Sequence, residues 1–295
     1  FLVGEKARLG PIAKAANIEL YGGTIRSGDR VLLLVGSRRA AGELRARLTR
    51  LVHGDSGVRT TREPLVRTVH SYAFGVLRLH AARNGDPPPR LLASAEQDAV
   101  VRDLLEGELH GWPGGTVPGS GWPERLRPAI GVPGFAAELR ELLLRAAERG
   151  LGPDELQALG DRHDVPEWVA AGRFFRTYEQ VVLLRGAVGR GAPQVTAPAL
   201  DAAELVGAAL DALASDPELL TAERARVRHL LVDDAQDLDP QQMELVRVLG
   251  RTARTVVLAG DPDQAVLGFR GADPSGLDAV DAPLVVLGVD RRARP

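Results

Sequence analysis

The chain has 295 residues, of which 44% are hydrophobic and 26% charged, and its formal net charge is -2. This balance is typical of a globular protein and excludes collagen, a coiled coil and a chain that is disordered throughout. The absence of cysteine excludes disulfides, thiol catalysis and cysteine–zinc sites, and with so small a net charge any nucleic-acid site has to be a local basic groove.

Length and hydropathy predict a cytoplasmic protein of about two domains, or of one domain that carries an insertion. No apolar run approaches the roughly 20 residues that cross a bilayer, and no signal peptide opens the sequence, so we expect no membrane partner. The sequence begins with Phe1 rather than Met, and we interpret this N-terminus as a cut or atypical end.

Two strand–loop–helix units are predicted in the N-terminal part of the chain. The apolar run 31–35 predicts a buried parallel strand. After it, apolar residues recur at helix spacing from Ala41 to Leu51. The segment 68–72 begins a second unit, in which we expect Ser71 to cap the helix.

The segment from residue 86 to 219 has a different composition and predicts a helical insertion without strands. Pro87–Pro89 interrupts regular structure, and we interpret Trp112, Trp122 and Trp168 as anchors of a small core. Helices are predicted around 135–146, from Pro153, around 168–178 and over 202–214, with a Gly/Pro-rich linker at 186–198.

Three apolar runs near the end of the chain predict that the sheet resumes at 229–232, 255–259 and 284–287. Short apolar strands that alternate with helices indicate a parallel α/β sheet, in which the loops at the carboxyl ends of the strands carry the chemistry. We therefore expect one α/β domain formed by residues 1–85 and 220–295, interrupted by the helical insertion 86–219.

Asp233, Asp234 and Gln236 directly follow the predicted strand 229–232. A carboxylate at this place can hold Mg²⁺, often through water, against nucleotide phosphates. The neighbouring acid can orient the attacking water, and the glutamine can report on the γ-phosphate. The same acids are also what a simple cap of the following helix, 240–249, would contain. This motif alone does not separate the two alternatives.

A second motif, residues 260–272, follows the next predicted strand. It contains Gly260, Asp261, Gln264 and Phe269, and by itself it is compatible with a plain turn rich in Gly, Pro and Asp. A plain turn does not explain two motifs that each end a strand and each contain glutamine. The pair therefore favours a shared phosphate site.

These two motifs resemble motifs II and III of the UvrD/Rep-type superfamily 1 DNA helicases. Asp233–Asp237 resembles D-E-x-Q-D, and 260–272 resembles G-D-x-x-Q-S-I-Y-x-F-R-G-A. The resemblance runs from about residue 31 to residue 292 and covers the first RecA-like half of such a motor with its helical 1B insertion, while the second half lies outside it. Four further segments resemble motifs in the family's order: 38–44 (motif Ia), 68–72 (T-x-H-S-[FY]), 200–205 (the segment before motif II) and 287–292 (motif IV).

The resemblance implies an α/β fold, a RecA-like parallel sheet of the P-loop NTPase type with an inserted all-helical subdomain. It implies an ATP-dependent DNA helicase or translocase that uses ATP and Mg²⁺ and acts on single-stranded DNA and duplex–single-strand junctions. Only two of the 37 basic residues are lysine. This Arg-rich composition, with Asp234 in motif II, is similar to actinobacterial AdnA-like subunits of helicase–nucleases, which would add a second helicase or nuclease subunit as a partner.

Position in the motifs implies the catalytic roles. Asp233 would bind Mg²⁺ through water, Asp234 would stand in place of the catalytic Glu, and Gln264 would contact the γ-phosphate and couple it to DNA. Arg292 would be the motif IV arginine at the γ-phosphate. The implied catalytic set is Asp233, Asp234, Gln264 and Arg292, and the implied nucleotide-binding set is Gln236, Gly260, Asp261, Gln264 and Arg292.

Position in the motifs also implies the DNA contacts. Phe269 would stack on a base, which any base sequence allows, and Arg39 would contact phosphate, which makes binding salt-dependent. His70, Ser71 and Arg270 complete the residues that the resemblance assigns to the single strand. Phe269 and the motif around His70 argue against a third alternative, a nucleotide switch that binds no nucleic acid.

The sequence departs from the family at the phosphate loop. No G-x-x-x-x-G-K-[ST] occurs, and the segment 10–15 in its place has Lys14 but lacks the glycines and the Ser or Thr that cradle phosphate and hold Mg²⁺. Asp234 is one methylene shorter than Glu, and Gly36 and Leu267 replace aromatic residues of the family. These departures favour a second alternative, a catalytically degenerate subunit that binds DNA or has a structural role. On either alternative, this chain alone is not expected to unwind DNA.

Overall fold

The computed structural model describes residues 2–3, 31–53, 66–110, 119–187 and 199–286. The chain forms two compact units, one of residues 1–75 with 213–295 and the other of residues 76–212. Both divisions fall inside helices, α3 (Val69–Asn84) and α8 (Glu204–Ser215), whereas the boundaries expected from the sequence follow changes in composition after residues 85 and 219. No described helix combines the length and the apolar character that a membrane crossing needs.

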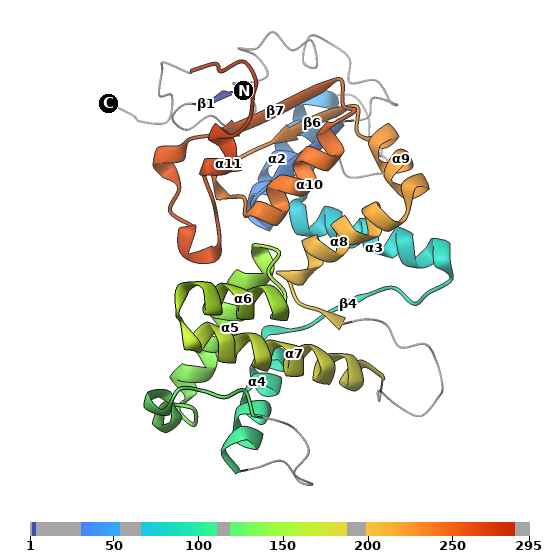
Figure 1. The fold of residues 1–295 in the computed structure, drawn as a ribbon. Coiled ribbons are helices and arrows are strands. Elements are labelled where there is room, and N and C mark those ends of the chain that lie inside the picture. The colour runs from blue at the N-terminus through green and yellow to red at the C-terminus, as the bar shows by residue number, and fades with distance from the viewer. Residues whose placement is uncertain (1, 4–30, 54–65, 111–118, 188–198, 287–295) are drawn as a thin grey trace. The chain divides into compact units, whose positions relative to one another are not determined.

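The first unit is built on a parallel sheet of five described strands (Figure 1). They are β1 (Leu2–Val3), β2 (Val31–Val35), β3 (Val66–Thr68), β6 (His229–Val232) and β7 (Thr255–Gly260). Their order is β1-β7-β6-β2-β3, and every neighbouring pair is parallel. The strands predicted at 31–35, 229–232 and 255–259 are confirmed, and so is the α/β fold class.

Helices pack against both faces of this sheet. On one face, Leu44 of α2 packs in a cluster with Leu231 of β6. On the other face, the end of α10 brings Gly250 against Leu230. Because successive strand residues point to opposite faces, burial on both sides explains why these strands are continuous apolar runs. The other elements of this unit are α2 (Arg38–His53), α9 (Pro217–Arg226), α10 (Pro240–Gly250), α11 (Ser275–Asp278) and the 3-10 turns η2 (Ala235–Asp237), η3 (Pro262–Gln264) and η4 (Gly268–Arg270).

The helix after β3 is capped by Thr68, so the prediction that Ser71 caps it was wrong. The Ser71 N–H donates to Thr68 Oγ1 at 3.1 Å, because the strand ends at Thr68 and the helix begins with the next residue. A buried bond, from the Tyr72 hydroxyl to Glu223 Oε2 at 2.7 Å, holds this helix to α9. Glu223 also pairs with Arg226 at 3.1 Å, and burial raises the pKa of Tyr72.

The apolar run 284–287 is not a buried strand, and that prediction was wrong over the described residues. Leu284, Val285 and Val286 are exposed, and Val285 alone forms a single bridge. Leu287 lies outside the described residues. A continuous apolar strand is typical of the interior of a parallel sheet, and the position beside β7 at this end of the sheet is occupied by β1.

The second unit is helical, as predicted, with one small exception. The expectation that 86–219 contains no strand was wrong, because β4 (Arg90–Leu91) and β5 (Ala199–Leu200) form a parallel pair. Two residues are too few to give a strand pattern in the sequence. The helices predicted around 135–146, from Pro153 and around 168–178 are confirmed. The helical elements are α4 (Ser94–His110), η1 (Glu124–Ala129), α5 (Pro133–Glu148), α6 (Pro153–His163) and α7 (Pro166–Ala187).

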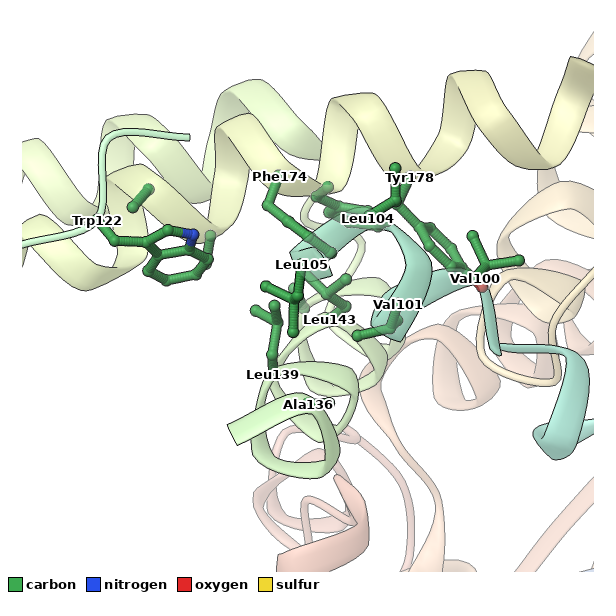
Figure 2. Packing of buried hydrophobic residues seen from close by; sticks show 14 of the residues in the cluster. Val100, Val101, Leu104, Leu105, Trp122, Ala136, Leu139, Leu143, Phe174 and Tyr178 are labelled. Atoms are coloured by element: carbon green, nitrogen blue, oxygen red, sulfur yellow. The ribbon is translucent and has the colours of Figure 1, made fainter. Parts of the chain in front are cut away.

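Side chains of α4, α5 and α7 gather in the core of this unit (Figure 2). Phe174 is completely buried, and the ring of Trp122 meets that of Phe135 edge-on, with centroids 5.1 Å apart. Trp168 packs against the same cluster. The prediction that tryptophans anchor a small core is therefore confirmed for Trp122 and Trp168, and Trp112 lies outside the described residues.

A buried carboxylate, Asp201, and a partly buried one, Glu204, lie at the start of α8. The Glu204 N–H donates to Asp201 Oδ1 at 2.7 Å, and the Asp201 N–H donates to Glu204 Oε2 at 3.0 Å, which is a capping box. Burial, and then the charge of Asp201, raises the pKa of Glu204 from its ordinary 4.5 to about 7. The folded chain therefore keeps a proton here that the unfolded chain loses.

Glu204→Gln is expected to raise the free energy of unfolding at pH 8 by about 2 kcal/mol. The pKa of Glu204 is higher in the folded state, so the contribution of this group to stability is fully present below about pH 4.5 and is lost as the pH rises through about 7. Glutamine still accepts the Asp201 N–H and removes this loss. Denaturant titrations at pH 5 and pH 8 measure the effect, with the exposed Glu138→Gln as the matched control. Equal stabilisation at both pH values would contradict the argument.

Candidate active site

The segments that contain predicted site residues leave the sheet at one edge. They follow β7, β6, β2 and β3, which are neighbours in that order. All these strands are parallel, so their carboxyl ends lie on the same side. Motifs III and II and the segments 38–44 and 68–72 therefore start from one edge of the first unit.

Asp233 and Asp234 have opposite surroundings. The Asp233 N–H donates to the Leu34 carbonyl at 2.9 Å, which continues the pairing of β6 with β2 by one residue, and the side chain is buried. Asp234 is exposed and has φ 51° and ψ 46°, the left-handed conformation. This conformation costs about 1–2 kcal/mol for most residues, and Asp is among the few that adopt it. The turn thus places one carboxylate inside the unit and the next at its surface.

Neither of these acids caps α10. The cap is Asp239, whose Oδ1 accepts the Gln242 N–H at 2.8 Å. The alternative in which Asp233 and Asp234 form the helix cap is therefore wrong. The signal for the true cap was present in the sequence, since Asp followed by Pro is a common helix start.

Gln236 joins the two motifs. Its buried side-chain oxygen Oε1 accepts the Asp261 N–H at 3.1 Å. Gly260 leaves room for this bond, because a Cβ at this position would lie only 2.8 Å from Gln236 Oε1. A second bond, from the Asp273 N–H to the Leu238 carbonyl at 2.9 Å, ties the same two segments further along. Sequence reasoning missed this linking role of Gln236, and the nucleotide contact that the resemblance implies stays a prediction.

Asp261 shapes the turn that carries Gln264. Its side chain is 7% exposed, and its Oδ1 accepts the Asp263 N–H at 3.0 Å, which caps η3. The plain-turn alternative is correct to that extent. Its second oxygen, Oδ2, accepts a hydrogen bond from Gln264 Nε2. No turn requires this second bond, so the carboxylate also orients the amide that the family motif assigns to the γ-phosphate.

The residues predicted on the DNA side are accessible in different degrees. Phe269 is 71% exposed in η4, and Arg39 is largely exposed at the start of α2. Ser71 is exposed, and His70 is partly buried. An exposed aromatic ring and an exposed guanidinium are suited to a base and a phosphate respectively. The side chain of Arg270 lies outside the described part of the structure.

Two predicted features fall outside the described residues. Arg292 belongs to the segment 287–292, and Lys14 belongs to the segment 10–15. Of the predicted catalytic set, the structure brings Asp233, Asp234 and Gln264 to one edge of the sheet. The γ-phosphate role of Arg292 stays a prediction.

The donor set after β6 suits Mg²⁺ held through water. Mg²⁺ keeps several waters and takes one or two carboxylates together with phosphate oxygens. Asp233 supplies one carboxylate, and burial together with the charge of Asp234 raises the pKa of Asp237 in the same turn, which a cation would counteract. Within the described residues, no group of three or more acidic or histidine side chains is placed to hold a metal alone.

Comparison with known proteins identifies relatives over most of the chain. The family model described as UvrD/REP helicase N-terminal domain matches residues 18–284. DNA helicase II of Escherichia coli is 24% identical over 243 residues, which make up 82% of this chain and 28% of that protein. DNA helicase II of Haemophilus influenzae is 25% identical over 208 residues, or 70% of this chain and 24% of that protein. ATP-dependent DNA helicase UvrD1 of Mycobacterium leprae is 37% identical over 93 residues, or 28% of this chain and 12% of that protein. The chain thus spans about a quarter of the length of the two DNA helicase II relatives.

Proposed function

Because the chain belongs to the UvrD/REP helicase N-terminal domain family, we propose that it forms the first RecA-like half of an ATP-dependent DNA helicase or translocase. The motor would couple ATP hydrolysis to movement along single-stranded DNA and would act at duplex–single-strand junctions. Its place would be the cytoplasm, where both DNA and ATP are available.

The observation that supports this proposal most directly is the buried bond from the Asp261 N–H to Gln236 Oε1. It holds the turn after β6 to the turn after β7, so that Asp233 and Gln264 lie at the carboxyl ends of neighbouring strands. A phosphate at this edge would be within the range of both turns.

The residues present supply each part of the proposed reaction. Asp233 would hold Mg²⁺ through water, and Mg²⁺ bound there would neutralise charge on the phosphates. Asp234, at the surface, would orient the attacking water. Gln264 would donate an amide N–H to a γ-phosphate oxygen and lose that partner after hydrolysis. The turn η4 follows Gln264 closely in the chain, so a movement of Gln264 would reach Phe269 and the base stacked on it.

Gln264→Ala in the intact protein is expected to lower ATP hydrolysis stimulated by single-stranded DNA about tenfold or more, because one hydrogen bond to a charged phosphate is lost. Phosphate release with and without single-stranded DNA measures the effect. Gln180→Ala, an exposed glutamine of α7, is the matched control and should keep the wild-type rate. An intact protein that binds DNA but hydrolyses no ATP would contradict the motor.

The missing phosphate-loop sequence supports a second candidate function. In it the chain is a degenerate motor half that binds DNA or has a structural role beside an active helicase or nuclease subunit, as in an AdnA-like complex. A test for ATP-dependent stepping on DNA separates the two functions. The motor binds an ATP analogue with Mg²⁺ and steps on DNA, whereas the degenerate subunit binds DNA with a salt-dependent affinity and shows no ATP-dependent step.

A further inference from the structure

The two oxygens of the Asp261 carboxylate accept hydrogen bonds from different groups of the same turn, one from the backbone and one from a side chain. Its Oδ1 accepts the Asp263 N–H at 3.0 Å, and its Oδ2 accepts Gln264 Nε2. Its own N–H is bonded to Gln236 Oε1 at 3.1 Å. Asp261 is therefore fixed by three hydrogen bonds, and the position of its second oxygen is determined by the other two.

This second oxygen selects one end of the Gln264 amide. The two ends of a glutamine amide are similar in size but opposite in hydrogen bonding, because Oε1 only accepts and Nε2 only donates. A carboxylate also only accepts, so Asp261 has to face the NH₂ end. One N–H is used in this bond, and the second N–H is left for another acceptor. Phosphate oxygens are acceptors too, so the second N–H is suited to a terminal phosphate.

We propose that Asp261 is a positioning residue that turns the Gln264 amide so that its second N–H faces the terminal phosphate of ATP. This inference rests on the function proposed above. Without the carboxylate, either end of the amide can face the phosphate, and the Oε1 end repels it.

Asp261→Asn keeps the turn but reverses which end of the Gln264 amide faces residue 261. The side-chain oxygen of the introduced asparagine still accepts the Asp263 N–H, as asparagine does at helix starts, and its NH₂ group then faces Gln264. A donor at this position requires Gln264 Oε1 as its partner. The amide turns over and presents an acceptor where the phosphate needs a donor.

In the intact protein, Asp261→Asn is expected to weaken binding of a non-hydrolysable ATP analogue with Mg²⁺ about tenfold to 100-fold. Binding of ADP should not change, because ADP lacks the terminal phosphate. The double variant Asp261→Asn/Gln264→Ala should bind the analogue no more weakly than Gln264→Ala alone. Asp261→Ser keeps a capping oxygen but offers no second oxygen, so it should give a smaller loss. Calorimetric titration measures the four variants and the wild type.

The control is Asp263→Asn in the same turn, since Asp263 is exposed and contributes its backbone N–H to the contact with Asp261. Unchanged discrimination between the analogue and ADP in Asp261→Asn overturns the inference, and so do losses that add in the double variant. Equal losses for both nucleotides with a lower melting temperature would make Asp261 only a cap, which also overturns it. Wild-type protein that binds no ATP analogue refutes the proposed function itself, and the inference falls with it.

Discussion

Gly260→Ala is expected to lower ATP hydrolysis stimulated by single-stranded DNA about 100-fold. A Cβ at this position would lie 2.8 Å from Gln236 Oε1, 3.0 Å from Leu277 Cδ1 and 3.1 Å from Gln236 N. The side-chain oxygen is bonded to the Asp261 N–H, and the backbone nitrogen cannot move unless the turn after β6 moves with it. The added methyl group therefore separates the two motifs, and a displacement of about 1 Å at a catalytic site can cost about 100-fold in rate.

The same substitution should lower the free energy of unfolding by about 1–3 kcal/mol, as overpacking of a tight interior does. Gly268→Ala is the matched control, because a Cβ there meets no atom within 4 Å. Steady-state hydrolysis and thermal unfolding distinguish the two variants. Wild-type hydrolysis by Gly260→Ala would show that the bond between Gln236 and Asp261 is not needed to assemble the site.

Continuous apolar runs in the sequence were enough to predict most strands of the sheet, but they did not distinguish every run that forms a strand from one that does not. The run 31–35 is buried on both faces, and such a strand leaves a continuous apolar signature in the sequence. The run 284–287 has the same signature, yet its described part is exposed. The run 31–35 pairs over several residues with β3 on one side and β6 on the other, whereas the described part of 284–287 forms a single bridge. Such pairing depends on residues far away in the chain.

The candidate site shows the same division between local and distant information. Asp233 and Gln264 could be assigned from motifs and from the rule that parallel sheets carry chemistry at their carboxyl ends. The bond that joins Gln236 to Asp261 spans 25 residues, and no local pattern predicts it. The bond between Tyr72 and Glu223 spans 151 residues. Residue identity at the site was therefore predictable, whereas the contacts that hold the residues were not.

Phe174→Ala is expected to lower the free energy of unfolding of the second unit by about 3–5 kcal/mol. The ring is 0% exposed, packs in the cluster shared by α4, α5 and α7 (Figure 2), and has its centroid 6.3 Å from that of Trp122. Alanine removes the whole ring and leaves a cavity that the surrounding helices can close only in part. Thermal and denaturant unfolding of the intact protein measure the loss, which should appear in the transition of the helical unit.

Phe269→Ala makes the same chemical change at an exposed position and is the matched control. Because Phe269 is 71% exposed, its removal should change stability by no more than about 0.5 kcal/mol. The proposed stacking on a base predicts instead that single-stranded DNA binds more weakly, by about 1–3 kcal/mol. Phe174→Ala below its melting temperature should keep the wild-type affinity for DNA. A Phe269→Ala variant that loses stability but binds DNA normally would contradict both the exposed position of this ring and its proposed contact with the strand.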